Sequence, residues 1–202
     1  ACDFEMLSRL RGISVPALKL AAGRGLLRFG CYARERAWVV VDPAGSNLQF
    51  RPLRPGLWFG KHKALSAKGA STKSPLGMGQ LSQAEQVHVV EGGPDLLAAH
   101  QVMLWMHGQT PDHIAAVAFL GASVDPSRGE CEKFEGKHIV IWAHADKPGM
   151  DSAERKLELL YPHVRSASVL LASEVLPGAK DLNDIVSSPG GFDAILARRE
   201  VF

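Results

Sequence analysis

The sequence lacks the features that mark several classes of protein. Its cysteines are too few for a disulfide framework or a zinc ribbon, since no CxxC pair occurs among Cys2, Cys31 and Cys131. The longest apolar runs, such as residues 114–120, are far shorter than the roughly 20 residues that span a bilayer. The first residues do not resemble a signal peptide, and no GxGxxG motif follows an expected strand. We therefore expect a reducing, cytoplasmic setting, no membrane partner and no Rossmann dehydrogenase.

The composition is that of a globular protein with an uneven distribution of charge. The 202 residues are 46% hydrophobic and 22% charged, which is enough for a sizeable core. The formal charge of +2 conceals 13 Lys and Arg against 5 Asp and Glu through residue 86, and 10 against 16 in the remainder. Such a split favours nucleic acid on one side and metal on the other, although ordinary surface scatter explains it equally well. Because the chain begins Ala-Cys-Asp, we expect it to be a fragment of a longer protein.

The chain divides into two parts of different character, residues 1–80 and 86–202. In the first part, helical patterns near residue 6 and over 15–27 precede an antiparallel β region over 30–60 and a polar loop over 61–78. In the second part, strands are expected at 87–90, 114–120, 138–143 and 167–172, and helices at 94–106, 150–161, 181–186 and 191–199. This alternation predicts an α/β fold with a mostly parallel sheet and helices on both faces, preceded by a smaller mixed α+β basic subdomain. Ligands of such folds bind at the carboxyl ends of the strands.

Acidic side chains gather at that edge of the expected sheet. They are Glu91, Asp95, Asp146, Asp181 and Asp184, with His144 two residues before Asp146. Carboxylates that converge from separate strand ends suit a divalent metal, which stabilises the charge that develops in phosphoryl transfer. Taken singly, an acid such as Asp95 or Asp181 is more often a helix N-cap that contributes roughly 1 kcal/mol. The combined pattern, rather than any one residue, predicts a metal site.

The order of these motifs resembles the Toprim domain, the metal-binding fold shared by topoisomerases, bacterial-type primases and some nucleases. The strand and glycine turn around Glu91 look like the first motif of the family, and residues 118–123 look like its middle strand and turn. Residues 144–149 resemble the Asp-x-Asp motif with its following glycine, and residues 180–184 resemble the third acidic motif of primases and primase-helicases. The resemblance covers about residues 86–190 and implies a Toprim-like sheet.

The resemblance breaks at His144, where the motif of the family begins with an aspartate. A neutral imidazole suits Mn²⁺, Zn²⁺ or Fe²⁺ better than Mg²⁺, and the site also loses a negative charge. The substitution is consistent with an altered metal preference, a weaker site or an inactive one. Without the motif around it, a histidine at this position is more often inert than a ligand.

The basic part resembles the loop that precedes the Toprim strand in DnaG-like and phage or mobile-element primases. A lysine, then Lys-Gly and a final Leu-Gly occur at positions 63, 68–69 and 76–77. The residues predicted to bind nucleic acid and nucleotides are Lys63, Lys68 and Lys73, Arg51 and Arg54 on the adjacent strand, and Lys180. The neighbouring Trp58 and Phe59 either stack on a base or belong to the core.

Together the two resemblances imply the RNA-polymerase core of a DnaG-like primase, which joins nucleoside triphosphates into a short primer on single-stranded DNA. They imply Mg²⁺ or Mn²⁺ held by the six residues of the metal site, with Glu91 and Asp146 as catalytic residues and Glu91 transferring a proton. A zinc-binding domain and a replicative helicase are the partners expected outside this chain.

Other functions remain open at the level of sequence. A non-catalytic module that binds single strands would keep the fold and lose the metal, and a Toprim nuclease would use the same acids to hydrolyse phosphodiesters. A topoisomerase is the least favoured function, because Tyr32 and Tyr161 lie in ordinary contexts.

Overall fold

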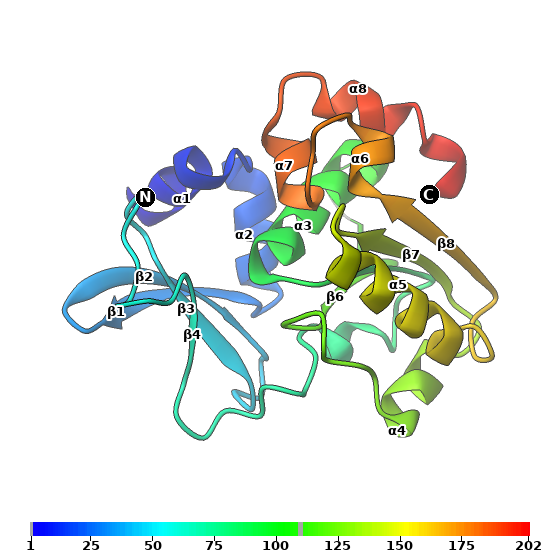
Figure 1. Ribbon diagram of the computed structural model, residues 1–202, viewed down its shortest axis with the longest axis horizontal. Coiled ribbons are helices and arrows are strands. Elements are labelled where there is room, and N and C mark those ends of the chain that lie inside the picture. The colour runs from blue at the N-terminus through cyan, green and yellow to red at the C-terminus, as the bar shows by residue number, and fades with distance from the viewer. Residues whose placement is uncertain (1, 109–110) are drawn as a thin grey trace.

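The computed structural model of the chain describes residues 2–108 and 111–202 (Figure 1). Its α-helices are α1 (Cys2–Arg11), α2 (Val15–Gly23), α3 (Gly93–His107), α4 (Arg128–Cys131), α5 (Lys147–Leu160), α6 (Ala172–Val175), α7 (Leu182–Ser187) and α8 (Gly191–Leu196). Its strands are β1 (Leu27–Tyr32), β2 (Glu35–Val41), β3 (Leu48–Pro52), β4 (Leu65–Ser66), β5 (Gln86–Val90), β6 (Ile114–Ala118), β7 (His138–Ala143) and β8 (Ser166–Leu171). Among these residues, no helix is both long and apolar enough to cross a membrane.

The first part of the chain forms an antiparallel sheet in the order β1-β2-β3-β4. The β1–β2 hairpin turns at Ala33 and Arg34, whose φ angles of 49° and 68° match the positive values that a tight hairpin turn requires. Strands β2 and β3 pair as their alternating pattern predicts, with Val39 opposite Phe50. The structure adds β1 and the short β4 to the strands that the sequence resolved.

The second part forms a parallel sheet in the order β6-β5-β7-β8, which confirms the expected α/β architecture. Successive residues of a strand point to opposite faces of the sheet. In β5, Val90 packs in the same cluster as Leu97 of α3, whereas Val89 packs with Ala153 of α5. Helices therefore cover both faces (Figure 1). Because the strands are parallel, β5 and β7 end at one edge, and α3 and α5 begin there.

One hydrophobic core joins the two parts of the chain. Trp38 of β2 and Leu97 of α3 belong to a single cluster of buried side chains. A second connection is an antiparallel bridge between Leu76 and the end of β6. There Gly77 has a φ of 88° and lies so close to β6 that a Cβ would overlap the carbonyl oxygen of Ala116. The two parts share a core, while the expected domain boundaries at residues 80 and 86 stay a prediction.

The boundaries of the helices differ from the sequence pattern for local reasons. The helix expected over 150–161 begins already at Lys147, because Asp146 caps it and Pro148 occupies its first turn. Helix α2 ends earlier than expected, since the chain turns at Gly25, with a φ of 76°, and enters β1. The hydrophobic pattern alone does not predict these caps and turns.

Candidate functional site

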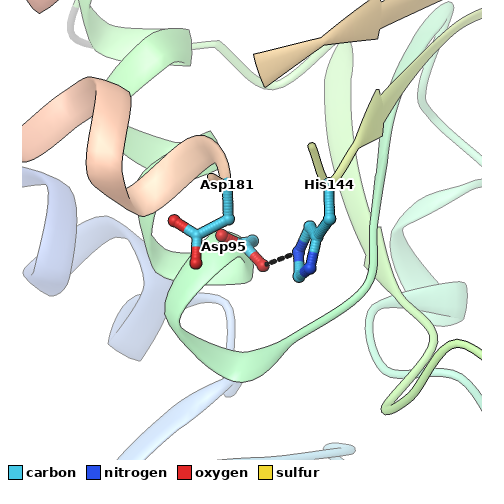
Figure 2. A group of neighbouring side chains, drawn as sticks. All are labelled: Asp95, His144 and Asp181. Carbon is cyan, nitrogen blue, oxygen red and sulfur yellow. Dashed lines mark hydrogen bonds and ion pairs between the residues drawn. The ribbon is translucent and has the colours of Figure 1, made fainter. Parts of the chain in front are cut away.

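Three side chains that could bind a metal converge at the carboxyl edge of the parallel sheet (Figure 2). Asp95 lies in the first turn of α3, His144 follows β7, and Asp181 precedes α7. One ligand atom from each of these residues lies within 4.8 Å of the other two. The sequence placed these residues at separate strand and helix ends, and the fold brings them together.

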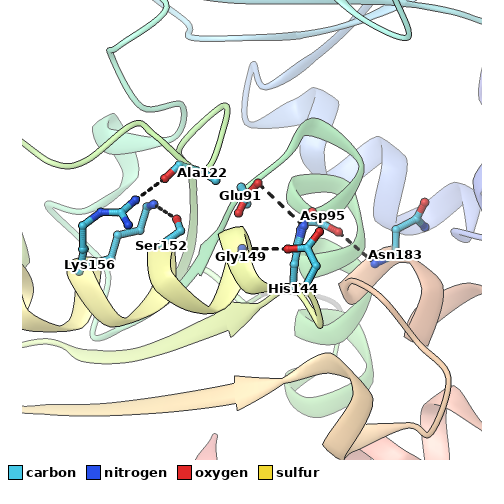
Figure 3. Close-up of polar contacts among 10 residues, drawn as sticks. Glu91, Asp95, Ala122, His144, Gly149, Ser152, Lys156 and Asn183 are labelled. Atoms are coloured by element: carbon cyan, nitrogen blue, oxygen red, sulfur yellow. Dashed lines mark hydrogen bonds and ion pairs between the residues drawn. The ribbon is translucent and has the colours of Figure 1, made fainter.

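Asp95 is the most deeply buried member of this group, with 3% of its surface exposed. Its Oδ2 lies 3.0 Å from Nε2 of His144, and its Oδ1 accepts a hydrogen bond from the backbone amide of Asn183 at 3.1 Å (Figure 3). A buried carboxylate is costly unless such partners satisfy it. Asp95 therefore holds α3, the end of β7 and α7 in a fixed relation.

His144 is surrounded by carboxylates, and they determine its charge. Burial lowers the pKa of its imidazole, but the hydrogen bond to Asp95 and the charges of Asp95, Glu91 and Asp181 outweigh burial and raise the pKa to about 9. The imidazole is therefore protonated at neutral pH in the metal-free protein and forms an ion pair with Asp95.

Glu91 and Asp181 complete the acidic side of the site. Glu91 directly follows β5, and its Oε1 lies 3.9 Å from Nδ1 of His144. Asp181 caps α7 by accepting a hydrogen bond from the amide of Asp184 at 2.8 Å. Burial, followed by the charge of Asp95, raises the pKa of Asp181 to about 6. The nearby carboxylate of Asp95 thus disfavours the ionised form of Asp181.

Asp146 does not belong to the group of three side chains whose ligand atoms lie within 4.8 Å of one another. Asp146 is exposed, caps α5 by accepting a hydrogen bond from the Gly149 amide at 2.8 Å, and is absent from the lining of the central cavity. Gly149 is required for close packing, because a Cβ there would overlap the Cβ of His144. Asp146 and Gly149 thus have structural roles as a helix cap and a close-packed glycine. A catalytic role for Asp146 stays a prediction.

A cavity of about 540 Å³ lies between this acidic edge and the antiparallel sheet. Its acidic lining consists of Glu91, Asp95, Asp181 and Asp184, and His144 lies among them. Its basic and aromatic lining includes Arg11, Arg51, Arg54, Trp58 and Lys63. The volume is in the range of cavities that hold small organic ligands such as nucleotides, roughly 300–1,000 Å³. Opposite charges therefore face each other across one cavity.

The predicted basic residues fall into two groups. Arg51, Arg54 and Lys63 line the cavity, whereas the exposed Lys68, Lys73 and Lys180 are not part of its lining. Arg54 was expected on the strand beside Arg51, but β3 ends at Pro52 and Arg54 lies in the following turn. Whether any of these side chains binds nucleic acid stays a prediction.

Arg11 is a cavity residue that the sequence analysis missed. Its guanidinium lies over the ring of Trp38 at 5.4 Å from the centroid, and that of Arg51 lies over the same ring at 5.8 Å. Burial and then the charge of Arg11 lower the pKa of Arg51 to about 10. Only the fold brings Arg11, at the end of α1, beside β3; the residue itself carried no signal beyond a basic charge.

Side chains of α5 hold the loop after β6 in place, and the hydrophobic pattern does not predict these contacts. Arg155 donates to the carbonyl of Ala122 at 2.7 Å and lies 3.4 Å from Asp125. The neighbouring Lys156 is buried and hydrogen-bonded to Ser152 (Figure 3). Its Nζ lies 3.9 Å from Oδ1 of Asp125. These contacts position the loop beginning at Leu120 and Gly121, which line the cavity.

The donor atoms of the site suit a divalent metal. Two carboxylates and an imidazole are a ligand set that favours Mn²⁺ and related ions over Mg²⁺. Asp95 and Asp181 line the same cavity with further acidic oxygens beside them. Binding requires that His144 lose its proton, so a metal must displace the ion pair between His144 and Asp95. The residues fit a metal on that condition.

Comparisons with known proteins give no family for the sequence. No protein-family model matches it, and neither does any curated protein.

Two solved structures are nevertheless similar to the fold. One is the primase fragment of the bacteriophage T7 primase-helicase protein, with a TM-score of 0.61 and 17% identity, covering 94% of this chain and 70% of that chain. The other is from bacteriophage T7 lagging-strand DNA polymerase interacting with primase domains of two gp4 subunits bound to an RNA/DNA hybrid and dTTP. Its TM-score is 0.60 and its identity 16%, covering 94% of this chain and 87% of that chain. At these identities the similarity establishes the fold alone.

Proposed function

We propose that this chain is the polymerising core of a primase, which joins nucleoside triphosphates into a short primer on single-stranded DNA. The observation that carries the proposal is the cavity in which an Asp–His–Asp group faces arginine and lysine side chains from the first part of the chain. The similarity in fold to the T7 primase fragment supports it. The proposal includes residues 86–202 as a Toprim domain and residues 1–80 as its basic subdomain.

In this proposal Asp95, His144 and Asp181 hold a divalent metal, Mn²⁺ or Mg²⁺, at the acidic edge of the cavity. Such a metal supplies stabilisation of the negative charge that develops on the transferring phosphoryl group. The side chain of Glu91 is 20% exposed beside this group. It accepts the proton that the attacking hydroxyl loses as the new O–P bond forms and pyrophosphate leaves.

The basic side of the cavity holds the phosphates of template and nucleotide. Arg11 and Arg51 are partly buried and stack on Trp38, so their planar guanidinium groups are preorganised for bidentate contacts with phosphate oxygens. Lys63 adds a positive charge at the exposed rim. The T7 complex includes an RNA/DNA hybrid and dTTP, and we propose nucleic acid and nucleoside triphosphates as ligands of this chain. A helicase and a zinc-binding domain are proposed as further partners.

A titration with Mn²⁺ and with Mg²⁺ tests the metal site. Asp181→Asn should weaken binding of Mn²⁺ by at least tenfold, because it removes one of the three proposed ligands. Asp146→Asn should leave the affinity within about threefold. Asparagine still caps a helix, so both variants should fold. A larger loss of affinity in Asp146→Asn than in Asp181→Asn would indicate that Asp146 is a metal ligand and would contradict the proposed ligand set. Primer synthesis on single-stranded DNA then tests the reaction, with Asp181→Asn as the inactive control.

A second function is favoured by one specific contact, the ion pair between His144 and Asp95. A protonated imidazole can replace the metal cation and leave a non-catalytic module that binds single strands. No binding of Mn²⁺ to the wild-type chain, together with intact binding of single-stranded DNA in the presence of EDTA, would establish this second function. Binding of Mn²⁺ with the release of a proton would support the primase.

A further inference from the structure

Trp58 differs from the other tryptophans of the chain. It is 47% exposed, whereas Trp38 and Trp142 are 0% and 4% exposed and Trp105 is half-buried. Burying a tryptophan side chain is favourable, so the exposed ring of Trp58 offers apolar area that a ligand could cover. The ring also lines the central cavity, on the side opposite the acidic group.

The backbone around Trp58 is held in place by a small turn. Phe59 and His62 exchange backbone hydrogen bonds of 2.9 and 3.1 Å, which places Trp58 and Lys63 on the two flanks of the turn. Phe59 is 9% exposed and packs edge-on against Tyr32, with ring centroids 5.0 Å apart. The structure thus assigns different roles to two adjacent aromatic residues: Phe59 anchors the turn and Trp58 is left at the surface.

Lys63 brings a positive charge to the exposed ring. Its Nζ lies 5.2 Å from the centroid of the Trp58 ring, a cation–π contact, and Lys63 also lines the cavity. An aromatic face beside a lysine combines the two interactions that hold an unpaired nucleotide, because the base stacks and the phosphate meets a cation. Stacking of this kind tolerates any base, since every base has a π face.

We propose that Trp58, with Lys63 beside it, is a stacking platform for one unpaired nucleobase at the rim of the cavity. The ligand is a nucleobase with its phosphate, supplied either by a single strand or by a nucleoside triphosphate. This assignment deepens the proposed function and rests on it for its biological meaning. The stacking itself requires neither metal nor catalysis, so it can be measured without them.

The experiment measures binding of a labelled oligothymidylate to the full chain by fluorescence anisotropy in EDTA. Trp58→Ala should weaken binding roughly tenfold, while Trp58→Phe should restore most of the affinity because it keeps an aromatic face. Tyr161→Ala is the matched control, since Tyr161 is 67% exposed at the end of α5 and does not line the cavity. That variant should bind like the wild type.

A strand of the same length with abasic sites throughout separates stacking from phosphate contacts. The ratio of wild-type to Trp58→Ala affinity should return to about one on this strand, because it has phosphates and no bases. An equal loss on both strands would overturn the proposal, and so would unchanged binding of both strands together with unchanged binding of dTTP. The same variants titrated with dTTP show the source of the base: a loss confined to the oligonucleotide assigns a template base, and one confined to dTTP assigns the incoming nucleotide.

This result is independent of the fate of the proposed function. A base-dependent effect of Trp58→Ala in a chain that makes no primers would support the platform and contradict the primase. If the wild-type chain makes primers and Trp58→Ala binds oligonucleotide and dTTP as well as the wild type, the primase would be supported and the platform contradicted. Because Trp58 is the most exposed tryptophan, quenching of intrinsic fluorescence by the oligonucleotide should also disappear in Trp58→Phe.

Discussion

The two sides of the cavity are built in different ways. On the acidic side, side chains also serve the fold: Asp95 binds the Asn183 amide and Asp181 caps α7. On the basic side, Arg54 and Lys63 are exposed, and within the described part of the chain neither has a carboxylate at ion-pair distance. Replacing Asp95 or Asp181 should therefore also affect stability, whereas the basic rim can be altered with effects on binding alone.

The largest expected effect is that of Asp95→Ala on stability. The change leaves the charge of His144 and the amide of Asn183 without their acceptor, and removing one partner of a buried ion pair costs about 3–5 kcal/mol. Urea unfolding measures the loss. Asp146→Ala, which removes only an exposed cap, should cost about 1 kcal/mol. Equal losses in the two variants would contradict the structural role given to Asp95.

Gly149→Ala should have the next largest effect. The added methyl group would overlap the side chain of His144, so either α5 or His144 must move, and such overpacking costs about 1–3 kcal/mol. Gly129 in α4 has no heavy atom near its expected Cβ, and Gly129→Ala should leave the free energy of unfolding unchanged or raise it slightly. A destabilised Gly129→Ala with an unaffected Gly149→Ala would refute the packing argument. Affinity for Mn²⁺ should fall only in the Gly149 variant.

The histidines near the cavity and in the core also differ, because their pKa values are shifted in opposite directions. The carboxylates raise the pKa of His144, whereas burial above all lowers the pKa of His88 and of His100 to about 3. Both are 0% exposed, and Nδ1 of His88 accepts a hydrogen bond from Trp142. Below the unfolded pKa of about 6.5, the unfolded chain binds protons that the folded chain cannot.

The free energy of unfolding should therefore fall as the pH decreases from about 6.5 towards 3, by about 1 kcal/mol per pH unit for each of these two histidines. Urea midpoints between pH 7.5 and 5 measure the slope. His100→Gln should reduce it, while the exposed His138 serves as the control position. A slope that His100→Gln leaves unchanged would show that His100 is protonated in the folded state.

The smallest effect is expected on the basic side. Lys63→Gln should weaken binding of single-stranded DNA several-fold and reduce the salt dependence by about one ion, because one phosphate contact is lost. Lys133→Gln, at an exposed position that does not line the cavity, is the matched control. Neither variant should change the free energy of unfolding by more than about 0.5 kcal/mol. An unchanged salt slope in Lys63→Gln would remove Lys63 from the interface.

Much of the fold followed from the sequence, because each strand and helix has its own local pattern. The apolar strand over 138–143 and the long helix beginning near Pro94 were expected within a residue of where they lie. Strand β4 and the early start of α5 were not, because one depends on pairing with β3 and the other on the Asp146 cap. Pairing and capping are decided by neighbours rather than by hydrophobic period.

Part of the cavity lining could likewise be predicted from the sequence. Glu91, Asp95 and Asp181 were identifiable because each stands at the end of an element, where the topology of a parallel sheet gathers side chains. Arg11 was not identifiable, because nothing near it in the sequence shows that α1 ends beside β3. Asp146 stood out as a motif residue, yet its carboxylate binds the amide of its own helix, a choice that depends on backbone geometry.

Local sequence patterns predict the alternation of strands and helices, the basic and acidic halves, and the residue types that stand at the carboxyl edge of the sheet. The folded arrangement of the chain establishes which of those residues meet, that His144 forms an ion pair with Asp95, and that Trp58 rather than Phe59 is exposed. The physical reason is range. Hydrophobic period and turn chemistry act over a few residues, whereas burial and charge depend on contacts between segments far apart in the chain.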